Sequence, residues 1–219
     1  MNKKLQFIKS KCKWLRQEIA RMVLPSKQGH IASALSQVEI CCTLFYGNIL
    51  NYKKGDPKYK KRDYFIISKG HSAMGAYPIY ADLGYFNKKD LKSYQKPKGN
   101  LRVYGDKSIP GVECTSGSLS QAVGIAAGIA YSKKINKNKN NVYVIISDGE
   151  HYEGSIWETA IFSSHYKLDN LIVIVDRNQQ IILGKTEKLM KLEPLNKKWE
   201  SFGWDVQTVN GHSIKNLLR

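Results

Sequence analysis

Two short runs of apolar residues restrict the fold of this chain more than any other feature. Residues 142–146 (VYVII) and 171–175 (LIVIV) contain no charged side chain, which is typical of parallel strands covered on both faces. Between them, residues 155–166 have helical spacing. A strand, a crossover helix and a second strand in so short a stretch form a βαβ unit. We therefore predict an α/β fold of three layers, doubly wound around a mostly parallel sheet.

The rest of the chain adds helices and short strands to this unit within one predicted domain, 1–219. Residues 3–24 place apolar side chains at helical spacing, and residues 33–46 repeat the pattern, with Ser36 and Glu39 as a possible capping box. Residues 120–135 are rich in Ala, Gly and Ile, which indicates a helix buried nearly all round. The other predicted elements are a strand at 63–69, a helix at 73–83, a long irregular loop at 93–111, a strand at 203–209 and a short helix from Ser213.

Composition narrows the class of protein without identifying it. The 219 residues are 42% hydrophobic, enough to bury a core, and 35 Lys and Arg against 18 Asp and Glu give a net charge of +17. That excess suits nucleic acid, anionic lipid or phosphorylated small molecules, or reflects only a Lys- and Asn-rich composition. Because the basic residues are scattered and form no RNA-binding motif, we expect no nucleic-acid partner.

The sequence carries no sign of a membrane or secretory protein. It has no run of eighteen apolar residues, and Lys residues interrupt the apolar positions near the N-terminus. Cys12, Cys41, Cys42 and Cys114 lack metal-binding spacing, so we interpret them as reduced thiols. We expect a cytoplasmic protein without a membrane partner.

Polar residues follow both apolar strands at their carboxyl ends, where open α/β sheets bind ligands. Asp148 follows the first strand and Asn178 the second. A carboxylate and an amide oxygen on neighbouring parallel strands suit Mg²⁺ or Ca²⁺. Gly149 would let the backbone approach a ligand closely, and the helix that follows would favour an anion.

The sequence around these residues resembles the thiamine-diphosphate motif of transketolases. The resemblance rests on SDGEHYEGSIWE at 147–158, KLDNL at 167–171 and DRN at 176–178. Further segments follow in the family's order, and together they extend over essentially the whole chain: QGHIASALS at 28–36, SKGHSAMGAY at 68–77, PGVECTSGSLSQAVGIAAGIA at 110–130 and KWESFGWDVQTVNGHS at 198–213.

This resemblance implies a role for particular residues. Mg²⁺ would be held by Asp148, Asn178 and the backbone carbonyl of Gln180, with Ca²⁺ as a substitute. The residues implied to bind thiamine diphosphate are His71, Gly117, Leu119, Asp148, Gly149, Glu150 and Asn178.

The resemblance also implies catalytic residues. His30 would bind the donor sugar and its developing oxyanion, and His71 the cofactor phosphate or the substrate. Glu153 and Glu158 would lie at the interface between cofactor sites, as paired carboxylates that share protons. Among the other histidines, we interpret His165 as structural and His212 as a surface residue, and we give His151 no role.

The implied activity is transfer of a two-carbon ketol unit from a ketose or ketose phosphate to an aldose or aldose phosphate. In this family the Glu that activates the cofactor's aminopyrimidine lies in a separate pyrimidine-binding domain. We therefore expect a second subunit that carries that domain, a heterotetramer formed by self-association of such pairs, and no activity without the partner.

Several positions depart from the family pattern. Ser147, Ser120 and Ala122 stand where glycines are usual, Tyr104 lies in the place of a His-Pro-acid motif, and Leu183 stands where Asp often precedes Gly184. We also expect the last strand and helix of the domain, with a substrate-binding His, to be lacking.

Three alternatives follow from these departures and from the charge. The chain could be a non-catalytic, degenerate assembly subunit, or another thiamine-diphosphate enzyme such as a specialised sugar-modifying transketolase homologue. Deoxyxylulose-phosphate synthase and the 2-oxo-acid dehydrogenases share the fold, but EGSIWE and KLDNL favour transketolase over both. A nucleic-acid-binding protein rests on the net charge alone.

Overall fold

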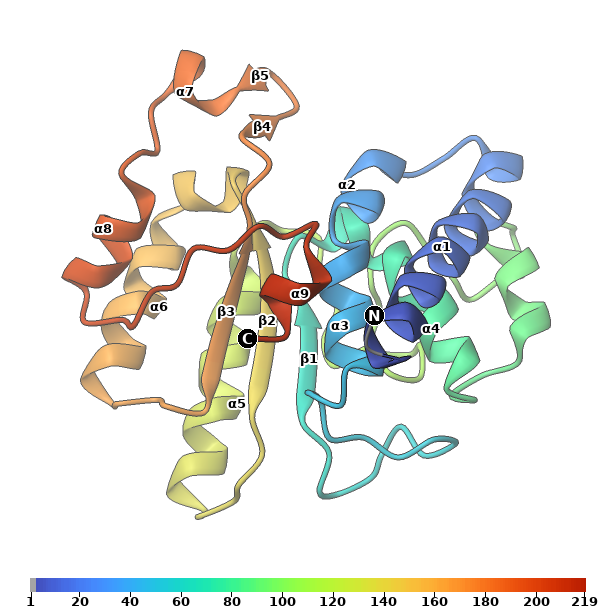
Figure 1. Ribbon diagram of the computed structural model, residues 1–219, viewed down its shortest axis with the longest axis horizontal. Helices are drawn as coiled ribbons and strands as arrows, with labels where there is room; N and C mark the ends of the chain where they lie inside the picture. Colours follow the sequence, from blue (N-terminus) through green and yellow to red (C-terminus); the bar gives the residue numbers. More distant parts are fainter. Residues whose placement is uncertain (1–2) are drawn as a thin grey trace. The chain divides into compact units, whose positions relative to one another are not determined.

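The computed structural model describes residues 3–219, whose contacts divide into two compact units (Figure 1). We call residues 64–69 and 116–208 the sheet unit. We call residues 3–63, 70–115 and 209–219 the helical unit.

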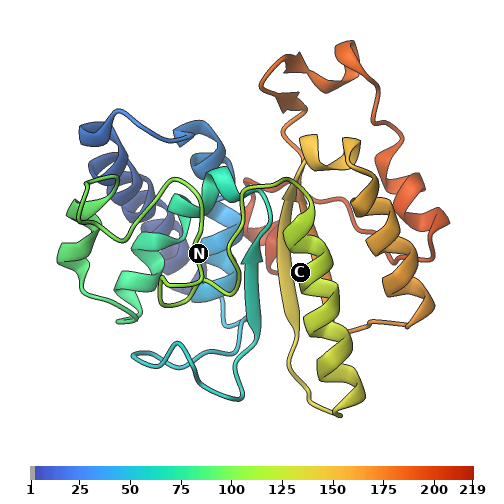
Figure 2. The same cartoon turned by 180° about the vertical axis from the view of Figure 1, so that it is seen from behind.

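The sheet unit is built on three parallel strands, β1 (Tyr64–Ile67), β2 (Val142–Ser147) and β3 (Leu171–Asp176), in that order. The central strand β2 is buried in all but its last residue, as its apolar sequence predicts. Helix α5 (Gln121–Ile135) packs against all three strands (Figure 2), and α6 (Gly154–His165) packs against α5 and connects β2 to β3. The predicted βαβ unit and α/β class are confirmed.

Smaller elements follow the carboxyl ends of β2 and β3. The 3₁₀ turn η4 (Gly149–Tyr152) comes directly after β2, and β4 (Gln180–Ile181) and β5 (Gly184–Lys185) form an antiparallel hairpin after β3. This hairpin and α7 (Thr186–Leu189) extend beyond the carboxyl ends of β2 and β3 (Figure 1). Helix α8 (Leu195–Ser201) completes the unit.

The helical unit contains α1 (Lys3–Val23), η1 (Leu24–Ser26), α2 (Ile31–Ser36), α3 (Val38–Tyr46), η2 (Gly70–Gly75), α4 (Tyr77–Asp82), η3 (Lys88–Ser93) and α9 (Ile214–Leu217). Helix α1 buries its apolar face and packs against α2, α3 and α4. None of the helices between residues 3 and 219 is both long and apolar enough to cross a bilayer. All four cysteines lie within the described residues, and none of them forms a disulfide bond there.

Two predictions for the helical unit are wrong in detail. The predicted helix at 33–46 is two helices that meet at Gln37, whose buried amide donates a 2.9 Å hydrogen bond to the carbonyl of Ser72. Gln37, not Ser36, is therefore the residue before α3, and no side chain caps this helix, so the capping box is not formed. The predicted helix at 73–83 begins only at Tyr77, because Pro78 suits the first turn of a helix and not its interior.

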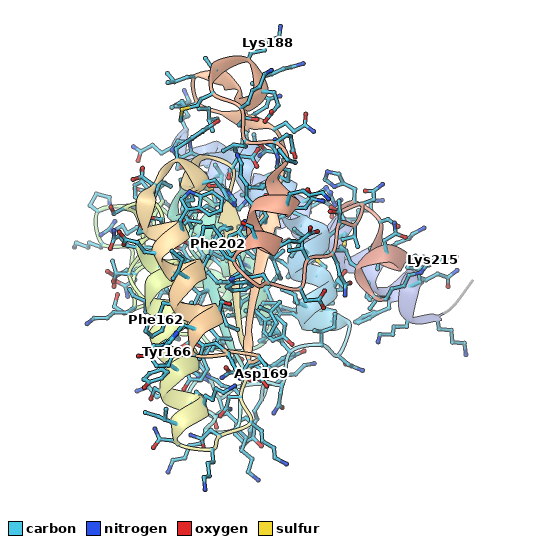
Figure 3. The ribbon with its side chains drawn as sticks, turned by 90° about the vertical axis from the view of Figure 1, so that its left-hand side faces the viewer. Phe162, Tyr166, Asp169, Lys188, Phe202 and Lys215 are labelled. Carbon is cyan, nitrogen blue, oxygen red and sulfur yellow. The ribbon has the colours of Figure 1, made fainter. Side chains whose placement is uncertain are left out.

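Two predictions for the sheet unit also need correction. Within the described chain, residues 203–209 form no strand: Gly203 lies in a turn, and the residues after it have no regular secondary structure and pair with no strand. Helix α5 is not buried all round, since Ile125 is 43% exposed and Ile135 is 60% exposed. The neighbouring face of α6 is likewise open, and Phe162 and Tyr166 lie beside each other on it (Figure 3).

Candidate functional site

The carboxyl ends of the three strands bring the polar residues of the sheet unit together. Ser147 at the end of β2 pairs with Asp176 at the end of β3. The next residues, Asp148 and Arg177, therefore leave adjacent strands side by side, at the edge where α/β sheets bind ligands.

Asp148 is the most unusual group at this edge. Its carboxylate is fully buried, and neither oxygen accepts a hydrogen bond of good geometry. Burial raises the pKa of Asp148, and the Arg177 guanidinium and the amides of Gln179 and Gln180 offset part of that rise. A buried carboxylate without hydrogen bonds is costly unless a cation or another donor is bound to it.

The other two predicted metal ligands lie in the turn after β3. Asn178 and Gln180 are exposed, and the Asn178 Oδ1 accepts a 2.9 Å hydrogen bond from the Gln180 amide. Gln179 between them has a φ of 61°, which turns the backbone here. Because the amides of Gln179 and Gln180 lie close enough to affect the Asp148 carboxyl, the turn after β3 lies beside Asp148. That Asp148, Asn178 and the Gln180 carbonyl bind one metal ion stays a prediction.

This ligand set is poor in charged groups. No group of three or more His, Cys, Asp or Glu side chains within residues 3–219 could hold a metal ion. One carboxylate, one amide oxygen and one carbonyl suit a hard cation that takes its remaining ligands from phosphate and water.

Three further residues predicted to contact the cofactor are half-buried or exposed. A Cβ added at Gly149 would meet one side-chain atom, the Cγ2 of Ile181, at 3.4 Å. Gly117 is exposed and Leu119 is half-buried, and both lie in the irregular segment before α5. Each of these positions is accessible to a ligand within the sheet unit.

The Glu150 carboxylate accepts four hydrogen bonds, which could not be predicted from the sequence. Its fully buried carboxylate accepts hydrogen bonds from the Ser147 amide (2.7 Å), the Ser147 hydroxyl (3.0 Å), the Ser120 amide (3.0 Å) and the Ser68 hydroxyl. These partners connect the ends of β1 and β2 with the start of α5. Its predicted contact with the cofactor stays a prediction.

Ser120, expected to stand in place of a glycine, has a backbone conformation that favours glycine. Its φ is 69° and its ψ −17°, in the left-handed region that favours glycine. The residue is buried, and its hydroxyl shares a hydrogen bond with that of Ser155 on α6. Ser147, the other serine expected to replace a glycine, donates hydrogen bonds from its amide and its hydroxyl to Glu150.

Two basic residues at this edge of the sheet were not among the predicted site residues. Lys69 follows β1, is 1% exposed and forms a buried ion pair with Asp176. The Arg177 Nη1 lies 2.9 Å from the Asp148 Oδ2, and its Nη2 lies 2.7 Å from Glu187 and 2.9 Å from Glu193. Nothing in the sequence distinguishes these two residues from the other members of a set of 35 Lys and Arg. The register of the strands is what places them at this edge.

His151 has a structural environment. Its Nδ1 lies 3.0 Å from the Ser147 carbonyl, and its Nε2 lies 3.1 Å from the indole nitrogen of Trp199. Since an indole N–H only donates, Nε2 accepts and Nδ1 carries the proton. Burial lowers the pKa of His151 to about 4, so the ring is neutral at pH 7.

The two predicted interfacial glutamates are not buried within this chain. Glu153 precedes α6, Glu158 lies one turn into it, and both are exposed. Nothing within the described residues buries these two carboxylates.

The two predicted catalytic histidines meet in the helical unit. The ring centroids of His30 and His71 are 5.2 Å apart, because α2, which follows His30, packs against η2, which contains His71. His30 is exposed, and His71 is half-buried. Gly29, with a φ of 115°, makes the turn that precedes His30.

The other histidines show no such grouping. His165 is exposed at the end of α6, where its ring contacts Tyr166. His212 is exposed, as predicted, and its Nδ1 lies 3.1 Å from the Glu39 carboxylate.

Comparison with known proteins gives this geometry a context. Residues 9–218 match the family described as "Transketolase, thiamine diphosphate binding domain". One subunit of the apulose-4-phosphate transketolase of Actinobacillus succinogenes is 38% identical over 213 residues, which are 96% of this chain and 77% of that protein. The SqwG subunit of the 6-deoxy-6-sulfo-D-fructose transketolase of a Clostridium species is 35% identical over 191 residues, 87% of this chain and 69% of that protein.

Longer transketolases match this chain over only part of their length. Human transketolase is 34% identical over 220 residues, 99% of this chain but 35% of that protein. The crystal structure of transketolase from Campylobacter jejuni superposes with a TM-score of 0.91 at 28% identity and covers all of this chain and 35% of that one. The chain thus spans about a third of these proteins.

Proposed function

The chain belongs to the transketolase family, in the part that binds thiamine diphosphate, and on that premise we propose that it is the N-terminal, cofactor-binding subunit of a split transketolase. The proposed activity is transfer of a two-carbon ketol unit from a ketose to an aldose, with Mg²⁺ and with a second subunit that binds the pyrimidine ring.

The observation that carries this proposal is the Asp148 carboxylate. It is fully buried at the carboxyl end of β2, has no hydrogen bond of good geometry, and lies beside an open glycine and the 178–180 turn. Such a carboxylate could serve as a ligand of a hard cation bound together with a diphosphate, so the residues present fit the proposed metal and cofactor.

Each proposed residue has a distinct task. Asp148, Asn178 and the Gln180 carbonyl would hold Mg²⁺, and the backbone of Gly149 and Gly117 would face the cofactor. Leu119 would pack against its rings. Thiamine diphosphate, when bound, supplies the nucleophilic carbon that accepts the two-carbon unit. Glu150 would keep the strand ends in place through its four hydrogen bonds.

The histidines of the helical unit would act on the sugar. His30 is exposed and able to donate a hydrogen bond to a hydroxyl or a developing oxyanion, and His71, in ring contact with it, would bind phosphate or substrate. We propose a phosphorylated sugar as substrate because the net charge of +17 favours anions.

The proposed partner is a pyrimidine-binding subunit. Two relatives that are at least 35% identical are named as single subunits of transketolases, and this chain covers at least 69% of each. The exposed Glu153 and Glu158 would become buried where copies of the assembly meet, in a heterotetramer. We propose a cytoplasmic enzyme, which agrees with four cysteines that form no disulfide bond within the described residues.

Calorimetric titration of thiamine diphosphate with Mg²⁺ tests the proposal, using the full chain alone and mixed with a candidate pyrimidine-binding subunit. Binding that tightens with the partner, followed by ketol transfer in a coupled assay, supports it. Binding without turnover would favour the non-catalytic assembly subunit instead. A folded chain that binds neither compound in either state would overturn the proposal.

A further inference from the structure

Arg177 is the only strongly basic group that the structure places on the Asp148 carboxylate among the described residues, and nothing in the proposed function uses it. It directly follows β3, and the β2–β3 register sets it next to Asp148. Its side chain is 18% exposed and its Nη1 lies 2.9 Å from the Asp148 Oδ2.

The remaining edges of the same guanidinium are held by other partners. Nη1 donates to the Thr186 hydroxyl (3.0 Å), Nη2 to Glu187 (2.7 Å), and Nε (3.1 Å) and Nη2 (2.9 Å) to Glu193. Burial would lower the pKa of Arg177, but its contacts with Glu193, Asp148 and Glu187 raise it, so it is charged at every relevant pH.

The guanidinium of Arg177 interacts with residues 186–193 and with Asp148 in different ways. Its contacts with residues 186–193 are hydrogen bonds of good geometry, whereas its contact with Asp148 is an ion pair in which neither carboxylate oxygen accepts such a bond. The guanidinium would therefore keep most of its hydrogen bonds if Asp148 were taken over by another cation. The single positive charge of Arg177 faces the carboxylates of Asp148, Glu187 and Glu193. The cluster therefore has a net negative charge that a second cation would offset.

We propose that Arg177 is a positioning residue that neutralises Asp148 in the metal-free chain and competes with the divalent cation for that carboxylate. This inference rests on the proposed function, since it assumes that Mg²⁺ binds at Asp148. Arg177 would hold the buried carboxylate in place when the cation is absent and would lower the affinity of the site for it. Arg177 would also connect the metal site to residues 186–193, which accept the other hydrogen bonds of its guanidinium.

Two measurements on the full chain test the competition. In EDTA, Arg177→Gln should lower the Tm by about 3 to 6 °C, because it leaves a buried carboxylate unpaired. With thiamine diphosphate present, in whichever state of assembly the wild type binds metal, Arg177→Gln should bind Mn²⁺, followed by its EPR signal, about tenfold more tightly than the wild type does. Arg177→Lys keeps the positive charge and should bind Mn²⁺ nearly as the wild type does.

Arg62→Gln is the matched control. Arg62, in the helical unit, is 16% exposed and pairs with Glu113 at 2.7 Å, so its loss should affect the Tm but not Mn²⁺ binding. A double-mutant cycle of Arg177→Gln with Asp148→Asn should show coupling in EDTA, which no purely local loss of the Glu187 and Glu193 contacts would produce.

The two proposals fail in different ways. A wild-type chain that binds no Mn²⁺ in any state overturns the proposed function and this inference with it. A wild-type chain that binds Mn²⁺, together with an Arg177→Gln variant that binds it equally or more weakly, overturns only the competition. Absence of Asp148–Arg177 coupling in EDTA does the same.

Discussion

The Nε2 of His151 accepts a hydrogen bond from the indole nitrogen of Trp199, 3.1 Å away, and this pairing fixes His151 as a neutral residue in the sheet unit. Its main-chain carbonyl accepts a further hydrogen bond, at 3.2 Å, from the indole of Trp157. Protonating the ring would replace the acceptor that Trp199 requires with a second donor.

This arrangement predicts a loss of stability in acid. The pKa of His151 is lowered by burial to about 4 from 6.5. The unfolded chain therefore takes up the proton first as the pH falls, and stability that is complete above pH 6.5 is lost as the pH falls towards 4. The shift corresponds to about 3 kcal/mol of unfolding free energy at most.

Urea unfolding at pH 7.5 and pH 4.5 measures this loss. His151→Gln should lose distinctly less stability than the wild type over that interval, even if it is less stable at pH 7.5. His165→Gln, at an exposed histidine, is the control and should follow the wild-type curve. Parallel curves for His151→Gln and the wild type would contradict the assignment.

Asp148→Asn should abolish Mg²⁺-dependent binding of thiamine diphosphate while the chain stays folded. An amide of the same shape removes the one negative charge among the proposed metal ligands, and we expect the affinity for the cation to fall about 100-fold or more. Calorimetry gives the affinity and circular dichroism the fold. Unchanged affinity would place the metal elsewhere.

Glu150→Gln should destabilise the sheet unit by about 2 kcal/mol or more. A glutamine amide offers one acceptor oxygen where the carboxylate accepts at both oxygens, and its NH₂ group would face the N–H and O–H donors of Ser68, Ser120 and Ser147. Chemical unfolding measures the change. Glu158→Gln, on the exposed face of α6, should change stability by less than about 0.5 kcal/mol.

His30→Ala should leave stability and cofactor affinity unchanged and reduce turnover of the assembled enzyme about 100-fold. The side chain is exposed and does not cap α2, so its loss removes no hydrogen bond that holds this helix. Steady-state kinetics of the assembled enzyme provide the test, and full turnover would assign His30 to the turn alone.

The parts of the fold that follow from local sequence were predictable. The apolar run at 142–146 has no other stable position than a central strand, and β2 is that strand. The prediction of a strand at 203–209 is wrong. Alternating side chains suit a strand, but they do not specify a neighbouring strand with which it could form hydrogen bonds. The break at Gln37 depends on the carbonyl of Ser72, 35 residues away, which no local pattern contains.

The residues of the candidate site were likewise predictable only where local sequence determines their position. Asp148 and Asn178 could be chosen from the sequence because strand ends are visible as the ends of apolar runs. The roles of Arg177 and Glu150 could not be, because they depend on register between strands and on donors from three separate segments. A position between two motif residues, such as Arg177, carries no signal until its partners are known.

Gly29→Ala should destabilise the helical unit by about 1 to 3 kcal/mol, because two costs arise at this turn. The φ of 115° is unfavourable for any residue with a Cβ, and an added Cβ would lie 2.6 Å from the Tyr94 hydroxyl and 2.7 Å from the Met74 methyl. Gly211→Ala is the matched control, since nothing lies within 4 Å of its added Cβ.

A second variant separates the two costs. Combining Gly29→Ala with Tyr94→Phe removes the nearest clashing atom, so any destabilisation that remains, relative to Tyr94→Phe alone, reports the backbone and Met74. We expect at least half to remain, because a side chain can move away while the turn before His30 cannot change its φ. Urea unfolding of the four proteins measures this, and full recovery in the double variant would show that the clash with Tyr94, not the backbone, requires glycine.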